Sequence, residues 1–116
     1  MSFSQVSLII FTIFLISAGQ ILFKWASQDI VLTPTGFLPS LFSLKVLLTM
    51  TVYGVATLLW FIALKNVPLR LAYPFAAMAF FIVPTLAHFI LGESLNWNVY
   101  VGAAIIGLGV FVSVMR

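Results

Sequence analysis

The sequence predicts an all-α integral membrane protein, a single domain of residues 1–116 folded as a bundle of four transmembrane helices. Hydrophobic residues make up 64% of the chain and charged residues 6%, whereas soluble domains average about 25% charged residues. A soluble chain this apolar would lack the polar side chains needed to cover its surface, so lipid is the expected solvent. Four runs without a charge are each long enough to cross a hydrocarbon layer about 30 Å thick.

The first uncharged run covers residues 3–23 and ends at Lys24. It lacks the basic start of a signal peptide and exceeds the usual length of its apolar region, so we expect a retained helix. Ser17, Gln20 and Lys24 are spaced i, i+3, i+7 and therefore share one face. Two interpretations stay open: these groups bind a substrate, or Lys24 extends to the headgroups while Gln20 bonds a neighbouring helix.

Residues 25–44 connect the first two spans and contain several helix breakers, so we expect an interfacial loop. Trp25 suits the membrane interface, where an amphipathic ring is favoured. Phe37 and Phe42 are too apolar for a free loop, which favours a short helix from about Pro39 lying on the membrane surface. The alternative is a hydrophobic loop that packs against its own bundle.

The second span covers residues 46–64 and contains Gly54 and Thr57. Because membrane helices pack through small residues, these two positions predict a close approach to another helix. A short turn that contains Lys65 and Arg70 follows, so the second and third spans should be antiparallel neighbours.

The third span, residues 71–92, contains side chains that a simple membrane anchor does not need. Pro74 and Pro84 should bend the helix, because proline has no backbone donor, and Pro84 should leave a carbonyl one turn earlier without its partner. At about 100° per residue, one side of this helix carries Tyr73, Ala77, Phe80, Pro84 and His88. We therefore expect the third span to shape a substrate path.

The fourth span, residues 95–115, carries two stripes of small residues. Ala103 and Gly107 are four residues apart, and Gly102 and Gly109 are seven apart. Both spacings favour contact between helix backbones. The contact is either within the chain or between two subunits, and we expect these four residues to form a subunit interface in a dimer.

Charged residues set the expected orientation and exclude several functions. The termini and the second loop share one side, with Lys65, Arg70 and Arg116, against Lys24 and Lys45 on the other. This excess of three over two predicts a multi-pass protein with both termini in the cytoplasm, and insertion in both orientations stays an open alternative. Scattered basic residues do not predict nucleic-acid binding. The chain has no cysteine, one histidine and two acidic residues, so we expect no metal site, no cofactor and no enzymatic activity.

Three short motifs occur in order along nearly the whole chain. They are Ala18-Gly19-Gln20 before Lys24, Asn66-Val67-Pro68 before Ala72-Tyr73-Pro74, and Gly92-Glu93 before Gly102. Their combination resembles the drug/metabolite transporter superfamily in its short, EamA-like four-span form. It is most similar to the subunits of the 4-amino-4-deoxy-L-arabinose-phosphoundecaprenol flippase, and more distantly to the small multidrug resistance proteins. The resemblance implies a flippase subunit of the bacterial inner membrane.

The chain departs from the small multidrug resistance proteins at one position. Those exporters carry a membrane-embedded glutamate eight residues before a lysine that aligns with Lys24, and Ile16 stands there in this chain. None of the four predicted spans contains an acidic residue. The amide of Gln20 does not exchange a proton near neutral pH, whereas the imidazole of His88 is a group that can.

The resemblance implies that the chain moves an undecaprenyl-phosphate-linked sugar between membrane leaflets. Lys24 is then expected to contact the phosphate, and the head group is expected to contact Gln20, Ser17, Tyr73 and His88. The expected partners are membrane lipids and a second four-span subunit, in a homodimer or a heterodimer. Two alternatives stay open: an exporter of cationic or guanidinium-type small molecules, and an accessory structural subunit without a path of its own.

Overall fold

The structure is a computed structural model that describes residues 2–115, so Arg116 lies outside the described residues. Four helices are long and apolar enough to cross a membrane, as predicted, and residues 2–115 contain no strand. They are α1 (Phe3–Ser27), α3 (Leu44–Leu64), a third span that covers Leu69–Leu91, and α6 (Trp97–Val114). A short helix, α2 (Phe37–Leu41), lies in the connection between α1 and α3.

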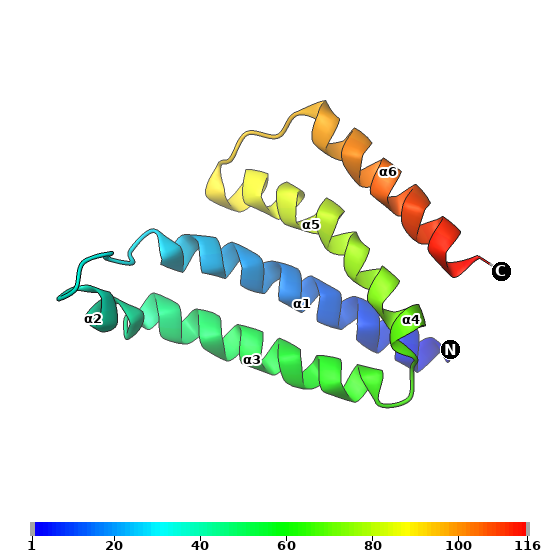
Figure 1. The fold of residues 1–116 in the computed structure, drawn as a ribbon, viewed down its shortest axis with the longest axis horizontal. Coiled ribbons are helices and arrows are strands. Elements are labelled where there is room, and N and C mark those ends of the chain that lie inside the picture. The colour runs from blue at the N-terminus through cyan, green and yellow to red at the C-terminus, as the bar shows by residue number, and fades with distance from the viewer. Residues whose placement is uncertain (1, 116) are drawn as a thin grey trace.

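The four long helices form an open row with α3 at one edge and α6 at the other. Figure 1 shows them side by side in the order α3, α1, α5 and α6. Helix α1 packs against both α3 and the third span, whereas α6 packs chiefly against the third span. A third of the apolar window of α1 is buried within the chain, but none of the corresponding window of α6 is buried.

Helix α1 is longer than the uncharged run that predicted it. Its first turn is fixed by a capping box, in which Ser2 accepts a hydrogen bond from the backbone of Gln5 and the Gln5 side chain accepts one from Ser2. The helix then continues past Lys24 and Trp25 to Ser27. Both of these side chains suit the headgroup region. The helix can therefore continue beyond Lys24, the first charged residue after the apolar run.

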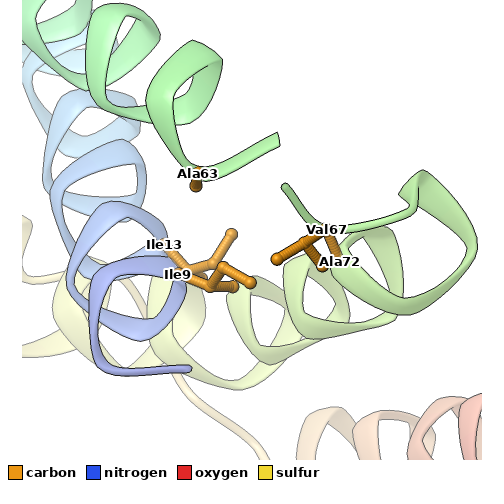
Figure 2. Close-up of a cluster of buried hydrophobic side chains, with 5 residues drawn as sticks. All are labelled: Ile9, Ile13, Ala63, Val67 and Ala72. Carbon is orange, nitrogen blue, oxygen red and sulfur yellow. The ribbon is translucent and has the colours of Figure 1, made fainter. Parts of the chain in front are cut away.

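A cluster of buried hydrophobic side chains closes one end of the molecule. Figure 2 shows Ile9 and Ile13 of α1 beside Ala63 of α3, Val67 of the following turn and Ala72. Here α3 packs against α4 (Leu69–Ala72), the first turn of the third span. Beyond this end the third span runs along α1 rather than α3, and the space between α3 and α5 widens (Figure 1).

Gly19 provides the close approach between α1 and α3. A Cβ atom at this position would lie 2.9 Å from Cδ2 of Tyr53, and the Tyr53 ring also packs edge-on against Phe23 at 5.0 Å. Gly54 makes no such contact within the described part of the chain, because a Cβ atom there would meet nothing within 4 Å, so its close approach to another helix stays a prediction. Thr57 bonds the Tyr53 carbonyl within its own helix.

The third span changes its helix type along its length. After α4 it continues as a 3₁₀ helix, η1 (Tyr73–Met78), then as α5 (Ala79–Leu86), and ends as a π-helix, η2 (Ala87–Leu91). Pro74 and Pro84 each remove the donor that an α-helix would supply to the carbonyl four residues earlier. Figure 1 shows that the third span is curved between α4 and the end of α5. Bends at Pro74 and at Pro84 stay predictions.

The connection between η2 and α6 covers residues 92–96. Gly92 ends η2 with a φ of 73°, a left-handed conformation that glycine adopts without strain. An irregular stretch follows, and α6 begins at Trp97 rather than at residue 95. Tyr100 then fixes the start of α6 to the third span: its hydroxyl lies 2.8 Å from that of Thr85 and its ring packs 4.9 Å from Phe81.

Candidate functional site

The divergence of α3 and the third span opens a groove over α1. We call it the aromatic groove, and its volume is about 280 Å³. Its lining residues are Ile13 and Ile16 of α1, Tyr53, Thr57 and Trp60 of α3, and Tyr73, Ala76 and Ala79 of the third span. Ile13 belongs both to the groove lining and to the hydrophobic cluster, so the cluster borders the groove at the Ile13 end. Aromatic side chains flank the groove.

The α1 side of the groove changes from aliphatic to polar along the helix. Gln20 lies seven residues after Ile13 and four after Ile16, so it continues the same helical stripe. Lys24 lies one further turn along, at the end away from the hydrophobic cluster. Both side chains are exposed. Neither side chain lines the groove, so the α1 stripe offers an amide and then an ammonium beyond it.

Among residues 2–115, Lys24 is the basic residue at this end of the protein that forms no ion pair. Lys45, the other basic residue on this side, forms an ion pair of 2.6 Å with Asp29, and its ammonium lies 4.7 Å from the centre of the Trp25 ring. This is the one ion pair found within residues 2–115. Lys45 therefore joins the start of α3 to Asp29 and Trp25 at the end of α1, whereas the charge of Lys24 is available for an anion.

Ser17 is separated from the two residues with which it was grouped. It is completely buried, and its hydroxyl donates a hydrogen bond of 2.8 Å to the carbonyl oxygen of Ile13. This bond within the helix satisfies the hydroxyl without any ligand. The structure thus brings Gln20 and Lys24 to one exposed stripe and leaves Ser17 in the packed part of α1.

Tyr73 and His88 lie at opposite ends of the third span. Tyr73 lines the aromatic groove and is 65% exposed. His88 is also exposed, and its Nδ1 lies 2.8 Å from the backbone oxygen of Glu93. Because a carbonyl oxygen only accepts, Nδ1 is the donor in this bond. His88 therefore ties down the chain reversal after η2, about 22 Å along the span from Tyr73 at 1.5 Å per residue.

The small residues of α6 have little packing role within the chain. A Cβ atom added at Gly102, Gly107 or Gly109 would meet no neighbouring atom within 4 Å. Ala103 is half-buried, and α6 has no fully buried residue. The glycines are thus not explained by contact with the other described helices. A subunit interface at these positions stays a prediction.

Sequence reasoning did not assign Tyr53 and Thr57 of α3 to a groove, and for Trp60 it favoured the aromatic belt over a cavity. Tyr53, Thr57 and Trp60 all line the aromatic groove, although Trp60 is also compatible with the aromatic belt of a membrane protein. Their spacing of i, i+4, i+7 places them on one face, and that pattern was the available signal. No group of three or more metal-ligating side chains occurs among residues 2–115.

The chain matches one protein family and is similar to three known proteins. The model of the EamA-like transporter family matches residues 1–115. A probable 4-amino-4-deoxy-L-arabinose-phosphoundecaprenol flippase subunit ArnF from Erwinia tasmaniensis is 32% identical over 111 residues, 87% of each chain. Two further relatives are probable subunits of the same flippase, in both cases subunit ArnE. The one from Pseudomonas savastanoi is 28% identical over 93 residues, 80% of this chain and 82% of the relative.

The other ArnE relative, from Pectobacterium atrosepticum, is 36% identical over 59 residues. That match covers 51% of this chain and 52% of the relative, so this chain spans about half the length of that protein. No solved structure matches the chain.

Proposed function

Because this chain belongs to the EamA-like transporter family, we propose that it is one subunit of a flippase for an undecaprenyl-phosphate-linked sugar. The observation that carries the proposal is the stripe of α1 that runs from the aromatic groove through Gln20 to the cation Lys24. A lipid substrate keeps its tail in the bilayer. The protein therefore needs to shelter only a polar head group while it crosses the apolar layer.

Each part of the path has a distinct task. The Lys24 ammonium attracts the phosphate as a point charge. Gln20 offers both donors and an acceptor to sugar hydroxyls. The rings of Tyr53, Trp60 and Tyr73 cover the apolar faces of a sugar while their hydroxyl and indole groups replace lost hydrogen bonds to water. Ser17 and His88 act indirectly in this proposal, by shaping α1 and the end of η2.

A second subunit completes the path. One chain leaves the aromatic groove open and leaves α6 without a buried face. Pairing through the glycines of α6, with an identical or a related four-span subunit, would give these surfaces a partner. We place the pair in the bacterial inner membrane with both termini in the cytoplasm, and the transport step changes no covalent bond.

Native mass spectrometry of protein purified from membranes tests the proposal. We expect the wild type to retain undecaprenyl phosphate lipids, and Lys24→Met to lose them without a change in abundance. Lys65→Met is the matched control, because Lys65 is an exposed lysine beyond the opposite end of α3. Retention of bulk phospholipids alone by the wild type would contradict the proposal.

The exporter alternative predicts a different signal. Both acidic residues, Asp29 and Glu93, lie outside the four membrane-length helices. Protein in proteoliposomes should therefore release no protons when cationic drugs are added, and drug-dependent, stoichiometric release would favour the exporter. Transport of the lipid anion is instead expected to respond to membrane potential, at about 2.3 kcal/mol per charge per 100 mV.

A further inference from the structure

The charged side chains are divided unequally between the two ends of the bundle. Figure 1 shows that α1 and the third span run in the same direction, so Lys24 lies at the end where η2 finishes. Both acidic residues, Asp29 and Glu93, follow α1 and η2 and lie at that same end. In the described part of the chain the opposite end has two basic residues, Lys65 and Arg70, and no acidic side chain. The field of the protein therefore draws an anion first to the end with Arg70.

Arg70 lines a surface groove at this end of the third span. We call it the Arg70 groove, and its volume is about 450 Å³. Its lining residues are Leu69, Arg70, Tyr73 and Pro74. Arg70 is exposed and forms no ion pair within residues 2–115. The groove thus offers a lipid phosphate an unpaired guanidinium, which can donate two parallel hydrogen bonds, beside an aromatic ring.

The Arg70 groove adjoins the aromatic groove at Tyr73, whose side chain lines both. The hydrophobic cluster borders the aromatic groove within the bundle, and Ile9 and Ala72 of this cluster are completely buried. A polar head group does not pass through side chains packed in this way. From the Arg70 end, its way to the aromatic groove therefore runs around the cluster and over Tyr73, which is 65% exposed.

We propose that Arg70 and Tyr73 form a second phosphate site, which captures the head group of a polyprenyl lipid before it enters the aromatic groove. This inference rests on the proposed function and deepens it, because it separates capture at Arg70 from retention at Lys24. Arg70 lies three residues before Tyr73, at one end of the aromatic groove, and Lys24 lies eleven residues after Ile13. The two cations are therefore about 20 Å apart along the bundle, at 1.5 Å per residue, and one phosphate cannot contact both.

The exposure of Arg70 suits a role in capture. A solvated ion pair adds little affinity, because water stabilises both separated charges. Charges at the rim of a binding site act mainly on the rate of association and on the choice of partner. We therefore expect Arg70 to decide which lipid enters the path, and Lys24 together with Gln20 to decide how long it stays.

Site-specific photocrosslinking tests where the lipid phosphate is captured. A benzophenone side chain at Leu69, which is 57% exposed in the Arg70 groove, should capture undecaprenyl phosphate in preference to phosphatidylglycerol in mixed vesicles. The same group at Ile62 should capture both lipids in proportion to their abundance, because Ile62 is 60% exposed and lines neither groove. Equal selectivity at Leu69 and Ile62 would assign the Arg70 groove to bulk lipid and overturn the inference.

Arg70→Gln should lower the preference at Leu69 about threefold, a change typical of the loss of one exposed ion pair. Lys65→Gln is the matched control, because Lys65 is exposed at the same end and does not line the Arg70 groove. Arg70→Lys should give an intermediate preference, since it keeps the charge without the planar fork. An equal loss in Arg70→Gln and Lys65→Gln, or no loss in Arg70→Gln, would contradict the inference.

Lys24→Met distinguishes failure of this inference from failure of the proposed function. Capture at Leu69 should continue in this variant, although the lipid no longer stays bound during purification. Loss of capture at Leu69 in Lys24→Met would indicate a single site and contradict the inference. A wild type that retains undecaprenyl phosphate but shows no preference at Leu69 would overturn the inference alone. A wild type that retains no polyprenyl phosphate would overturn the proposed function and this inference together.

Discussion

Helices α1 and α6 are both apolar enough to cross a membrane, yet they use their glycines in opposite ways. In α1, Gly19 lies against the Tyr53 ring, where a Cβ atom would be 2.9 Å from the nearest carbon. In α6, Gly107 and Gly109 face open space. Lipid and protein interior are equally apolar, so hydrophobicity does not distinguish a packed glycine from an unpacked one. Only the atoms that surround each glycine make that distinction.

Helices α1 and α6 therefore have different roles in the protein. Helix α1 is held on two sides and carries the polar stripe on a rigid base. Helix α6 packs chiefly against the third span, beside η1 and, through Tyr100 near its start, beside α5, and its apolar window has no buried residue. The rest of its surface can contact lipid or another subunit. Substitutions in α1 should therefore affect the path or the fold of one chain, whereas substitutions in α6 should affect assembly.

The largest expected effect is at Lys24. Lys24→Met should abolish translocation of the lipid head group in proteoliposomes, because it removes the cation at the end of the stripe. Lys24→Arg should be intermediate, since it keeps the charge but replaces a compact ammonium by a planar fork. Gln20→Leu should cause a partial loss of the same kind.

The control for this series is membrane insertion. A lysine that only anchors the helix end acts through its charge and length, so arginine would replace it without loss. Full translocation by Lys24→Met at equal abundance would show that Lys24 is an anchor, and it would leave the proposed path without a partner for the phosphate.

Gly19→Leu should destabilise the individual chain. The new side chain must displace the Tyr53 ring, and overpacking of this kind usually costs about 1–3 kcal/mol. Thermal unfolding in detergent should report a lower midpoint for this variant. Gly54→Leu is the matched control, because a Cβ atom at Gly54 meets nothing within 4 Å. An equal loss of stability in both variants would argue against the close approach at Gly19.

Gly107→Leu should leave the unfolding midpoint unchanged and weaken association. We expect the dissociation constant of the dimer to rise about tenfold, which corresponds to about 1.4 kcal/mol. Crosslinking in native membranes and analytical ultracentrifugation in detergent measure this change. A wild type that is monomeric in native membranes would refute the dimer, and an unaltered dimer in Gly107→Leu would place the interface elsewhere.

The fold was predictable from the sequence because charge is costly in the hydrocarbon layer. The uncharged runs predicted all four membrane-length helices, and the differences are confined to their ends. Helix α1 extends to Ser27 because Lys24 and Trp25 are tolerated at the interface. Helix α6 starts only at Trp97, after the left-handed turn at Gly92 and an irregular stretch.

The candidate site was predictable only in part. Gln20 and Lys24 do share an exposed stripe, but Ser17, three residues before Gln20, is buried. Periodicity places all three on one side, and only the packing of the neighbouring helices decides which part of that side is covered. The same limit applies to Tyr53 and Trp60, because in a membrane an aromatic side chain suits the belt, the lipid or a groove equally well.

The smallest expected effect is at Tyr100, which contacts the third span near the start of α6. Tyr100→Phe keeps the ring that packs 4.9 Å from Phe81 and removes only the hydroxyl that lies 2.8 Å from the Thr85 hydroxyl. Hydrogen bonds between membrane helices contribute about 0.6 kcal/mol on average, so the unfolding midpoint should fall only slightly. Thr85 retains its bond to the Phe81 carbonyl and is not left unpaired. Tyr100→Ala, which also removes the ring, should loosen α6 and weaken the dimer. If Tyr100→Phe lowers the unfolding midpoint as much as Tyr100→Ala does, then the hydroxyl pair, rather than the ring contact, holds the start of α6 in place.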